Sequence, residues 1–115
     1  MNYERQENTE WANQRLRILA IEAEEILQRT SYPDLNAIQE YQKTICKWWD
    51  DTGGILTSVY KDRDVWKHHC PPIIELELKS EFLKEAHEKL RGQLAITLEG
   101  LEYLLSRWDE ATATS

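Results

Sequence analysis

The sequence predicts an all-α protein, a three- or four-helix bundle with a long C-terminal helix. Leu and Glu, which both favour helices, are the most frequent residue types, whereas Val, which favours strands, occurs only twice. Apolar residues also recur in steps of three and four over long stretches, and this spacing places them on one helix face. The 115 residues leave room for one domain, and we expect residues 1–8 and 110–115 to be flexible ends.

The first helix is expected over residues 11–30, with Asn8 or Thr9 as its N-cap. Pro33 should end it, because the residue before a proline avoids the helical region. The spacing of four and three places a single apolar stripe on the side that faces the core. The stripe consists of Ala12, Leu16, Leu19, Ala23, Ile26 and Thr30.

The second helix is expected to begin at residues 31–34, where a serine followed three residues later by an acid matches a capping box. It should end at Gly53-Gly54, because glycine readily adopts the left-handed conformation of a helix C-cap. Its buried stripe is expected at Leu35, Ile38, Tyr41 or Gln42, Ile45, and Trp48 or Trp49.

A third helix is expected over residues 55–69, ended by Cys70-Pro71-Pro72. The last helix is expected over residues 73–108. Residues 74–79 alternate in polarity like a strand, but a lone strand would have no partner, so helix is preferred. A helix of this length would overhang the others, and its exposed apolar surface predicts a homodimer through the C-terminal helix. Its stripe is Leu83, His87, Leu90, Leu94, Leu98, Leu101, Leu105 and Trp108.

Charge and composition exclude several classes of protein. The net charge is −7, no apolar run approaches the roughly 18 residues of a membrane span, and the N-terminus is polar and acidic, unlike a signal or transit peptide. Two cysteines make no disulfide framework. We therefore expect a cytoplasmic protein with no contact with a membrane.

One short segment carries a candidate catalytic pair. Of the four segments 1–31, 32–52, 53–70 and 71–115, only residues 53–70 have a net positive charge, and within this segment Arg63 is followed five residues later by His68. This spacing resembles the active-site signature of HEPN-type ribonucleases, which are small all-α proteins of toxin–antitoxin or defence systems and usually act as dimers. The resemblance implies that Arg63 stabilises charge on the phosphate and that His68 acts in acid–base cleavage with the RNA 2′-hydroxyl. Cys70 stands where some members have Tyr, and Pro71-Pro72 interrupt the helix.

Other chemistry is not indicated. His68, His69 and Cys70 are consecutive, so their side chains point in different directions and cannot converge on one zinc ion. His87 lies alone on an apolar stripe, as a hydrogen-bonded core histidine does. We expect no metal, no cofactor and no established catalytic set.

The candidate binding residues are aromatic or basic. Trp48 and Trp49 are consecutive, so one of them should lie at the surface, and tryptophan is enriched at interface hot spots. Trp66 lies in the positive stretch. Lys43 and Lys47 share a helix face and could join a local basic patch with Lys61, Arg63 and Lys67.

These patterns predict a non-enzymatic protein that acts by protein–protein interaction, as a subunit, adaptor or inhibitor of a larger assembly. The first alternative is the HEPN-like, metal-independent ribonuclease. The second is a small helical subunit of a nucleoprotein complex that touches nucleic acid through such a basic patch, which is not favoured because no motif supports it.

The ribonuclease hypothesis predicts that the purified protein cleaves single-stranded RNA without added metal. Arg63→Ala and His68→Ala should each abolish cleavage, because one removes the phosphate-binding charge and the other the proton donor. A gel assay on labelled RNA measures both effects. A wild-type protein that cleaves no RNA would remove the hypothesis.

Overall fold

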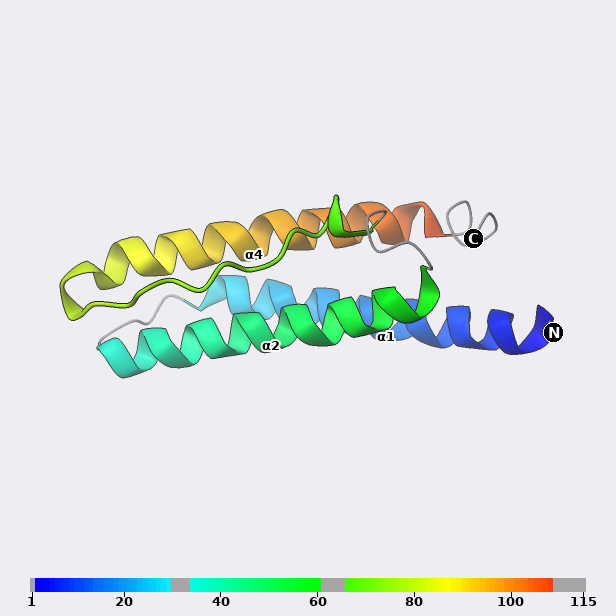
Figure 1. Cartoon of the computed structure of the whole chain (residues 1–115), viewed down its shortest axis with the longest axis horizontal. Coiled ribbons are helices and arrows are strands. Elements are labelled where there is room, and N and C mark those ends of the chain that lie inside the picture. Colours follow the sequence, from blue (N-terminus) through cyan, green and yellow to red (C-terminus); the bar gives the residue numbers. More distant parts are fainter. Residues whose placement is uncertain (1, 30–33, 61–65, 109–115) are drawn as a thin grey trace.

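Three long helices form the part of the protein that the structure describes. The computed structural model describes residues 2–29, 34–60 and 66–108, with side chains from residue 9 onward. The helices are α1 (Asn2–Gln28), α2 (Leu35–Val59) and α4 (Leu83–Ser106), and a 3-10 turn, η1 (Ser80–Phe82), precedes α4. These ranges contain no strand, so the predicted all-α bundle is confirmed. Figure 1 shows α1 running antiparallel to both α2 and α4.

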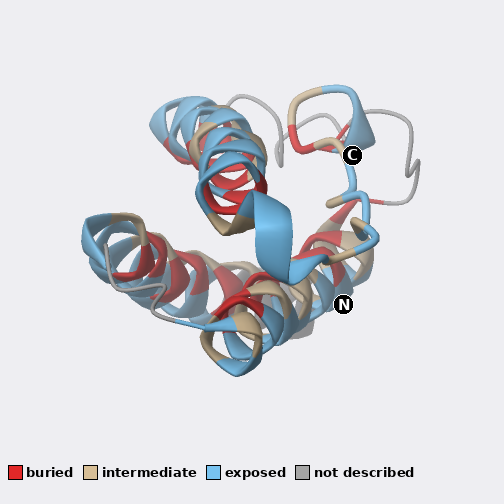
Figure 2. Ribbon diagram, turned by 90° about the vertical axis from the view of Figure 1, so that its left-hand side faces the viewer, coloured by how far each residue is buried: buried red, intermediate tan, exposed pale blue. Residues whose placement is uncertain are grey.

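The core lies where the apolar faces of the three helices meet, and the buried residues in Figure 2 turn toward one another. The predicted stripe of α1 is buried from Ala12 to Ile26, and α4 buries leucines at the predicted spacing. Two side-chain hydrogen bonds join α2 to α1: Trp48 Nε1 donates to the Leu19 carbonyl over 2.6 Å, and Tyr41 Oη donates to the Ile26 carbonyl over 3.4 Å. Among the described helices none is long and apolar enough to cross a membrane.

The helix starts differ from the predicted ones. The prediction of Asn8 or Thr9 as an N-cap is wrong, because α1 already begins at Asn2. Residues 2–8 lack an apolar period but include Glu, Arg and Gln, which are good helix formers. Helix α2 is capped by Asp34, whose Oδ1 accepts from the Ala37 amide over 2.9 Å. Ser31, the other half of the predicted capping box, lies outside the described residues.

The prediction that the second helix ends at Gly53-Gly54 is also wrong. Helix α2 continues to Val59 and ends at Tyr60, which has extended backbone angles, so a single helix over residues 55–69 does not form. No described glycine has a positive φ. Gly53 instead makes room for a neighbour, because a Cβ there would lie 3.1 Å from Cη2 of the Trp66 indole.

The last helix is shorter than predicted, because it begins at Leu83 and not at residue 73. Residues 71–79, here called the strap, are extended and contain no helix. In Figure 1 the strap runs back along α2 and α4, so that these two helices are parallel. The overhanging helix that predicted a homodimer through the C-terminal helix is therefore absent, and α4 packs against both α1 and α2.

Residues 69–70, which lead into the strap, cross the surface of α4 at Gly100. A Cβ on Gly100 would overlap the His69 carbonyl oxygen and lie 3.3 Å from the Cys70 amide nitrogen. The backbone of residues 69–70 therefore rests directly on the backbone of α4. Only glycine permits so close an approach.

A matched pair of alanine substitutions tests this contact. Gly92 lies in the same helix facing open space, so Gly92→Ala should raise the free energy of unfolding by about 1 kcal/mol through helix propensity. Gly100→Ala should lower it by about 1–3 kcal/mol, because the new methyl group displaces the strap entry. Urea denaturation followed by circular dichroism measures both. Equal stabilisation by the two substitutions would show that residues 69–70 do not pack on Gly100.

Candidate interaction surfaces

The turn before the strap is built around a buried tryptophan. Trp66 is only 2% exposed and packs against Trp49, with ring centroids 5.9 Å apart, and against Gly53. Its Nε1 has no hydrogen-bond partner, so packing holds the indole in place. The prediction of Trp66 as a binding residue needs correction, because its side chain belongs to the core.

Two glutamines hold the strap by its backbone. Gln93 of α4 accepts from the Ile74 amide through Oε1 over 2.6 Å and donates through Nε2 to the Ile74 carbonyl over 3.2 Å. Gln42 of α2 accepts from the Leu76 amide over 2.8 Å. These side-chain amides supply hydrogen bonds that a neighbouring strand would supply in a sheet.

Two further hydrogen bonds hold the backbone where the strap begins, at residues 70 and 71. Thr97 of α4 donates to the Pro71 carbonyl over 3.0 Å, and Trp49 of α2 donates through Nε1 to the Cys70 carbonyl over 3.4 Å. The strap thus covers the groove between α2 and α4 with the chain's own residues.

The strap and its entry also bury part of the predicted Trp48–Trp49 patch. Trp48 is only 3% exposed, and its indole lies in the core. Trp49 is the outer member of the pair, but it is half-buried against Trp66 and the strap entry. The pair therefore divides into a core and a rim member as predicted, without leaving an open aromatic patch.

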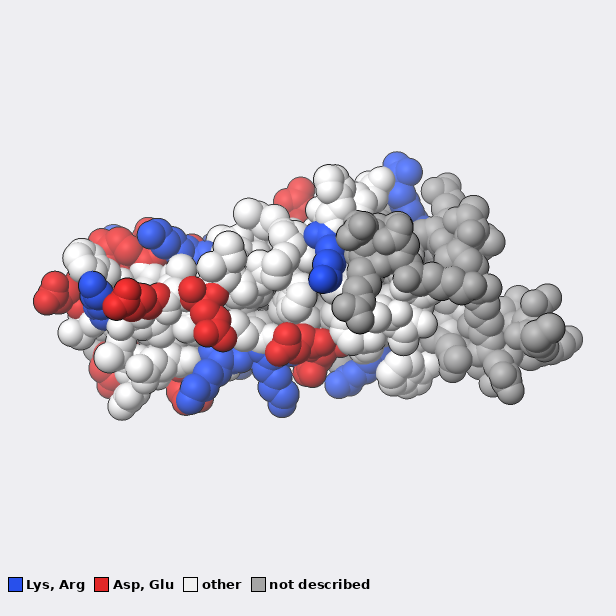
Figure 3. Space-filling model, viewed as in Figure 1, with Lys and Arg blue, Asp and Glu red and all other residues white. Residues whose placement is uncertain are grey.

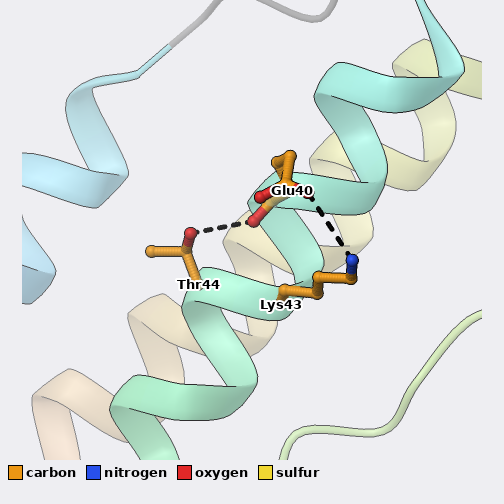
Figure 4. A network of polar contacts seen from close by, with 3 residues as sticks. All are labelled: Glu40, Lys43 and Thr44. Atoms are coloured by element: carbon orange, nitrogen blue, oxygen red, sulfur yellow. Dashed lines mark hydrogen bonds and ion pairs between the residues drawn. The ribbon is translucent and has the colours of Figure 1, made fainter.

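The predicted basic residues of α2 lie at the surface among acids. Lys43 is exposed and forms an ion pair with Glu40, with Nζ 3.6 Å from Oε1, while Thr44 donates to the Glu40 carbonyl (Figure 4). Lys47 is exposed as well. Figure 3 shows Lys and Arg interspersed with Asp and Glu on this face, without one positive field. Lys61 lies outside the described residues, so the nucleic-acid hypothesis stays a prediction.

The candidate catalytic pair is only partly placed. Arg63 lies outside the described residues. His68 is exposed, and its ring meets that of His69 edge to face at 5.4 Å. His69 in turn stacks on Tyr103 of α4 at 4.7 Å. The ribonuclease hypothesis therefore stays a prediction from the sequence.

His87 is the buried, hydrogen-bonded histidine that its position predicted. It is 5% exposed, its Nε2 lies 3.0 Å from the Arg29 carbonyl oxygen, and its ring packs 4.7 Å from that of Tyr41. Across the described residues, no three His, Cys, Asp or Glu side chains come together in a way that could hold a metal ion.

A series of exposed apolar side chains lies on the outer side of α1. Trp11, Ile18 and Ile21 are 58%, 46% and 57% exposed. The steps of seven and three residues place the three side chains on one helix face, away from the core stripe. The spacing of this second apolar series is present in the sequence, but the core stripe of the same helix is longer and more regular, and only the core stripe was predicted.

A groove of about 440 Å³ borders this face, between α1 and α4. Its lining is mostly apolar, with one basic residue on the α1 side and one acidic residue on the α4 side. The lining residues are Arg17, Ala20, Ile21, Glu102, Leu105 and Ser106. We call Trp11, Ile18, Ile21 and this groove the α1 face.

Other exposed apolar residues are less open to a partner. Ile96 and Tyr103 share a face of α4, but the Tyr103 ring is covered by His69 and by the Arg107 guanidinium, 4.9 Å from the ring centroid. Ile74 on the strap and Phe82 in η1 are each the single large apolar side chain of their element that is exposed.

No protein-family model, curated protein or solved structure matches the chain.

The two cysteines report on how tightly the strap closes. Cys70 is 1% exposed, and burial raises its pKa to about 12. Cys46 is half-buried on α2, and its pKa is raised chiefly by burial and further by the carboxylates of Glu75 and Asp50. Both thiols are free.

A thiol reagent at pH 8 should therefore modify Cys46 first and leave Cys70 unmodified in the folded protein. With a pKa near 12, only about one Cys70 in 10⁴ is a thiolate at this pH, and the thiolate is the reactive form. Reaction in a Cys46→Ser variant isolates Cys70, and unfolding in urea should release it. Equal rates for folded and unfolded Cys46→Ser would mean that the strap entry does not bury Cys70.

Proposed function

We propose that the protein is a non-enzymatic interaction module, a subunit, adaptor or inhibitor of a larger assembly, whose contact surface is the α1 face. The observation that carries the proposal is the exposure of three large apolar side chains, Trp11, Ile18 and Ile21, on one side of one helix. Scattered exposed apolar residues are normal on a protein surface, but several on one helix face next to a groove are typical of a binding site.

The energetic argument is direct. Completing the burial of a large apolar side chain that is about half exposed is worth on the order of 1 kcal/mol at about 25 cal/mol per Å². Trp11, Ile18 and Ile21 each offer such a gain to a partner. Tryptophan also has the large, rigid surface that dominates interface energies.

The shape of the α1 face favours a helix as the partner element. The groove lies between two antiparallel helices, where a third helix can set its side chains into the spaces of both. Arg17 lies on one side of the groove and Glu102 on the other. An amphipathic helix with an apolar stripe and charges of both signs fits this surface.

The groove between α2 and α4 is a less favourable binding surface than the α1 face. There the chain's own strap occupies the groove between α2 and α4, held by Gln42 and Gln93. A partner would have to displace it. We place the module in the cytoplasm, and its two free thiols support this setting.

A photocrosslinking experiment tests the proposal. A photoreactive phenylalanine analogue replaces Ile18 on the α1 face, and the control carries it at Asn36, which is exposed on α2. In the native cells, the probe at residue 18 should give a discrete crosslinked product, and the control should not, because only the first lies within a contact. Products of equal yield at both positions, or none at residue 18, would contradict the α1 face as the binding surface.

A further inference from the structure

The charged residues that directly flank the exposed isoleucines of α1 are divided by sign. Arg15 and Arg17 precede Ile18, and Glu22 and Glu24 follow Ile21. All four charged side chains are exposed. The apolar centre of the α1 face therefore has basic residues on the N-terminal side and acidic residues on the C-terminal side.

These residues also follow a heptad. Trp11 and Ile18 are seven residues apart, as are Gln14 and Ile21, so the four occupy a and d positions. Arg15 and Glu22 then fall at e positions on one flank of the seam. Arg17 and Glu24 fall at g positions on the other flank. A heptad with charged e and g positions is the pattern by which two helices pair along a seam.

We infer that the helix that covers the α1 face is α1 of a second copy of this chain, in antiparallel orientation about a twofold axis. The inference rests on the proposed function and names the partner of the same surface. In this register Ile18 of each copy lies against Ile21 of the other, and Trp11 lies over the aliphatic part of Gln28. The contact is isologous, so every pair occurs twice.

The charges match across the seam. Arg15 of one copy faces Glu22 of the other, and Arg17 faces Glu24, so the twofold axis generates four ion pairs of opposite sign. A surface that complements itself in both apolar register and charge needs no other protein to cover it.

Residue 25 selects the antiparallel orientation. A parallel pair would also bring Arg17 near Glu22, so the e and g charges alone allow both orientations. In a parallel pair, however, Glu25 occupies an a position and would face Glu25 of the other copy across the seam. Two carboxylates this close repel each other. In the antiparallel pair Glu25 meets Gln14, whose amide can donate to the carboxylate.

A charge-exchange experiment tests the inference. The wild-type protein should sediment as a dimer at about 100 μM. The double variants R15E/R17E and E22R/E24R should each self-associate at least about 100-fold more weakly, because four attractive pairs become repulsive. An equimolar mixture of the two variants should dimerise again, because all four pairs regain opposite signs. All substitutions lie at exposed positions, so circular dichroism should show unchanged folding.

The orientation has its own measurement. In a Cys46→Ser background, Gln14→Cys mixed with Glu25→Cys should form a mixed disulfide under mild oxidation, and Gln14→Cys alone should form none. A Gln14→Cys homodisulfide without the mixed product would overturn the antiparallel register.

The outcomes separate this inference from the function on which it rests. A wild-type chain that stays monomeric at 100 μM, together with a crosslink from residue 18 to a different protein, overturns self-association and leaves the interaction module intact. A monomeric chain with no crosslink overturns both. Failure of the variant mixture to restore the dimer overturns the charge register even if the wild type dimerises.

Discussion

The contact between the backbone at residues 69–70 and Gly100 of α4 is the constraint on which the rest of the architecture depends. Because no side chain separates the two backbones, the chain can turn from the buried Trp66 directly into the groove between α2 and α4. The strap then returns the chain along the bundle, so that α4 runs parallel to α2. A short connection would instead have produced an antiparallel neighbour.

The strap also determines which surface is left for a partner. A three-helix bundle has three grooves between neighbouring helices, and here one of them is filled by extended chain whose backbone is held by Gln42 and Gln93. No other described segment covers the outer side of α1 in this way, although that side carries Trp11, Ile18 and Ile21. The same bundle therefore has a side closed by the strap and a more open side, and the open side is the surface that we propose for binding.

The helix class, the core stripes and the buried role of His87 could be predicted from the sequence, because periodicity reports which side chains face inward. The boundaries could not. Gly53 carries the same signal whether it caps a helix or makes room for Trp66, and the difference depends on residues far along the chain. The alternation in polarity over residues 74–79 indicated extended backbone correctly. The hydrogen-bond partners of this backbone are, however, the side chains of Gln42 and Gln93, and a strand pattern does not reveal side-chain partners. Among the candidate binding residues, Lys43 and Lys47 are exposed, whereas Trp48 and Trp66 are buried. The sequence could not predict which tryptophans are buried, because burial depends on how the helices pack.

The tryptophan indole groups supply the most direct measurement of the central claim, that the α1 face pairs two copies of the chain while the strap side stays closed. The measurement is the two-dimensional NMR spectrum of the indole N–H groups and of the Ile74 and Leu76 amides on dilution from about 500 to about 10 μM. The account predicts that the Trp11 indole signal shifts with concentration, while the Trp66 indole and the two strap amides keep their positions. A Trp11 signal that does not change, or strap amides that shift together with it, would contradict the account.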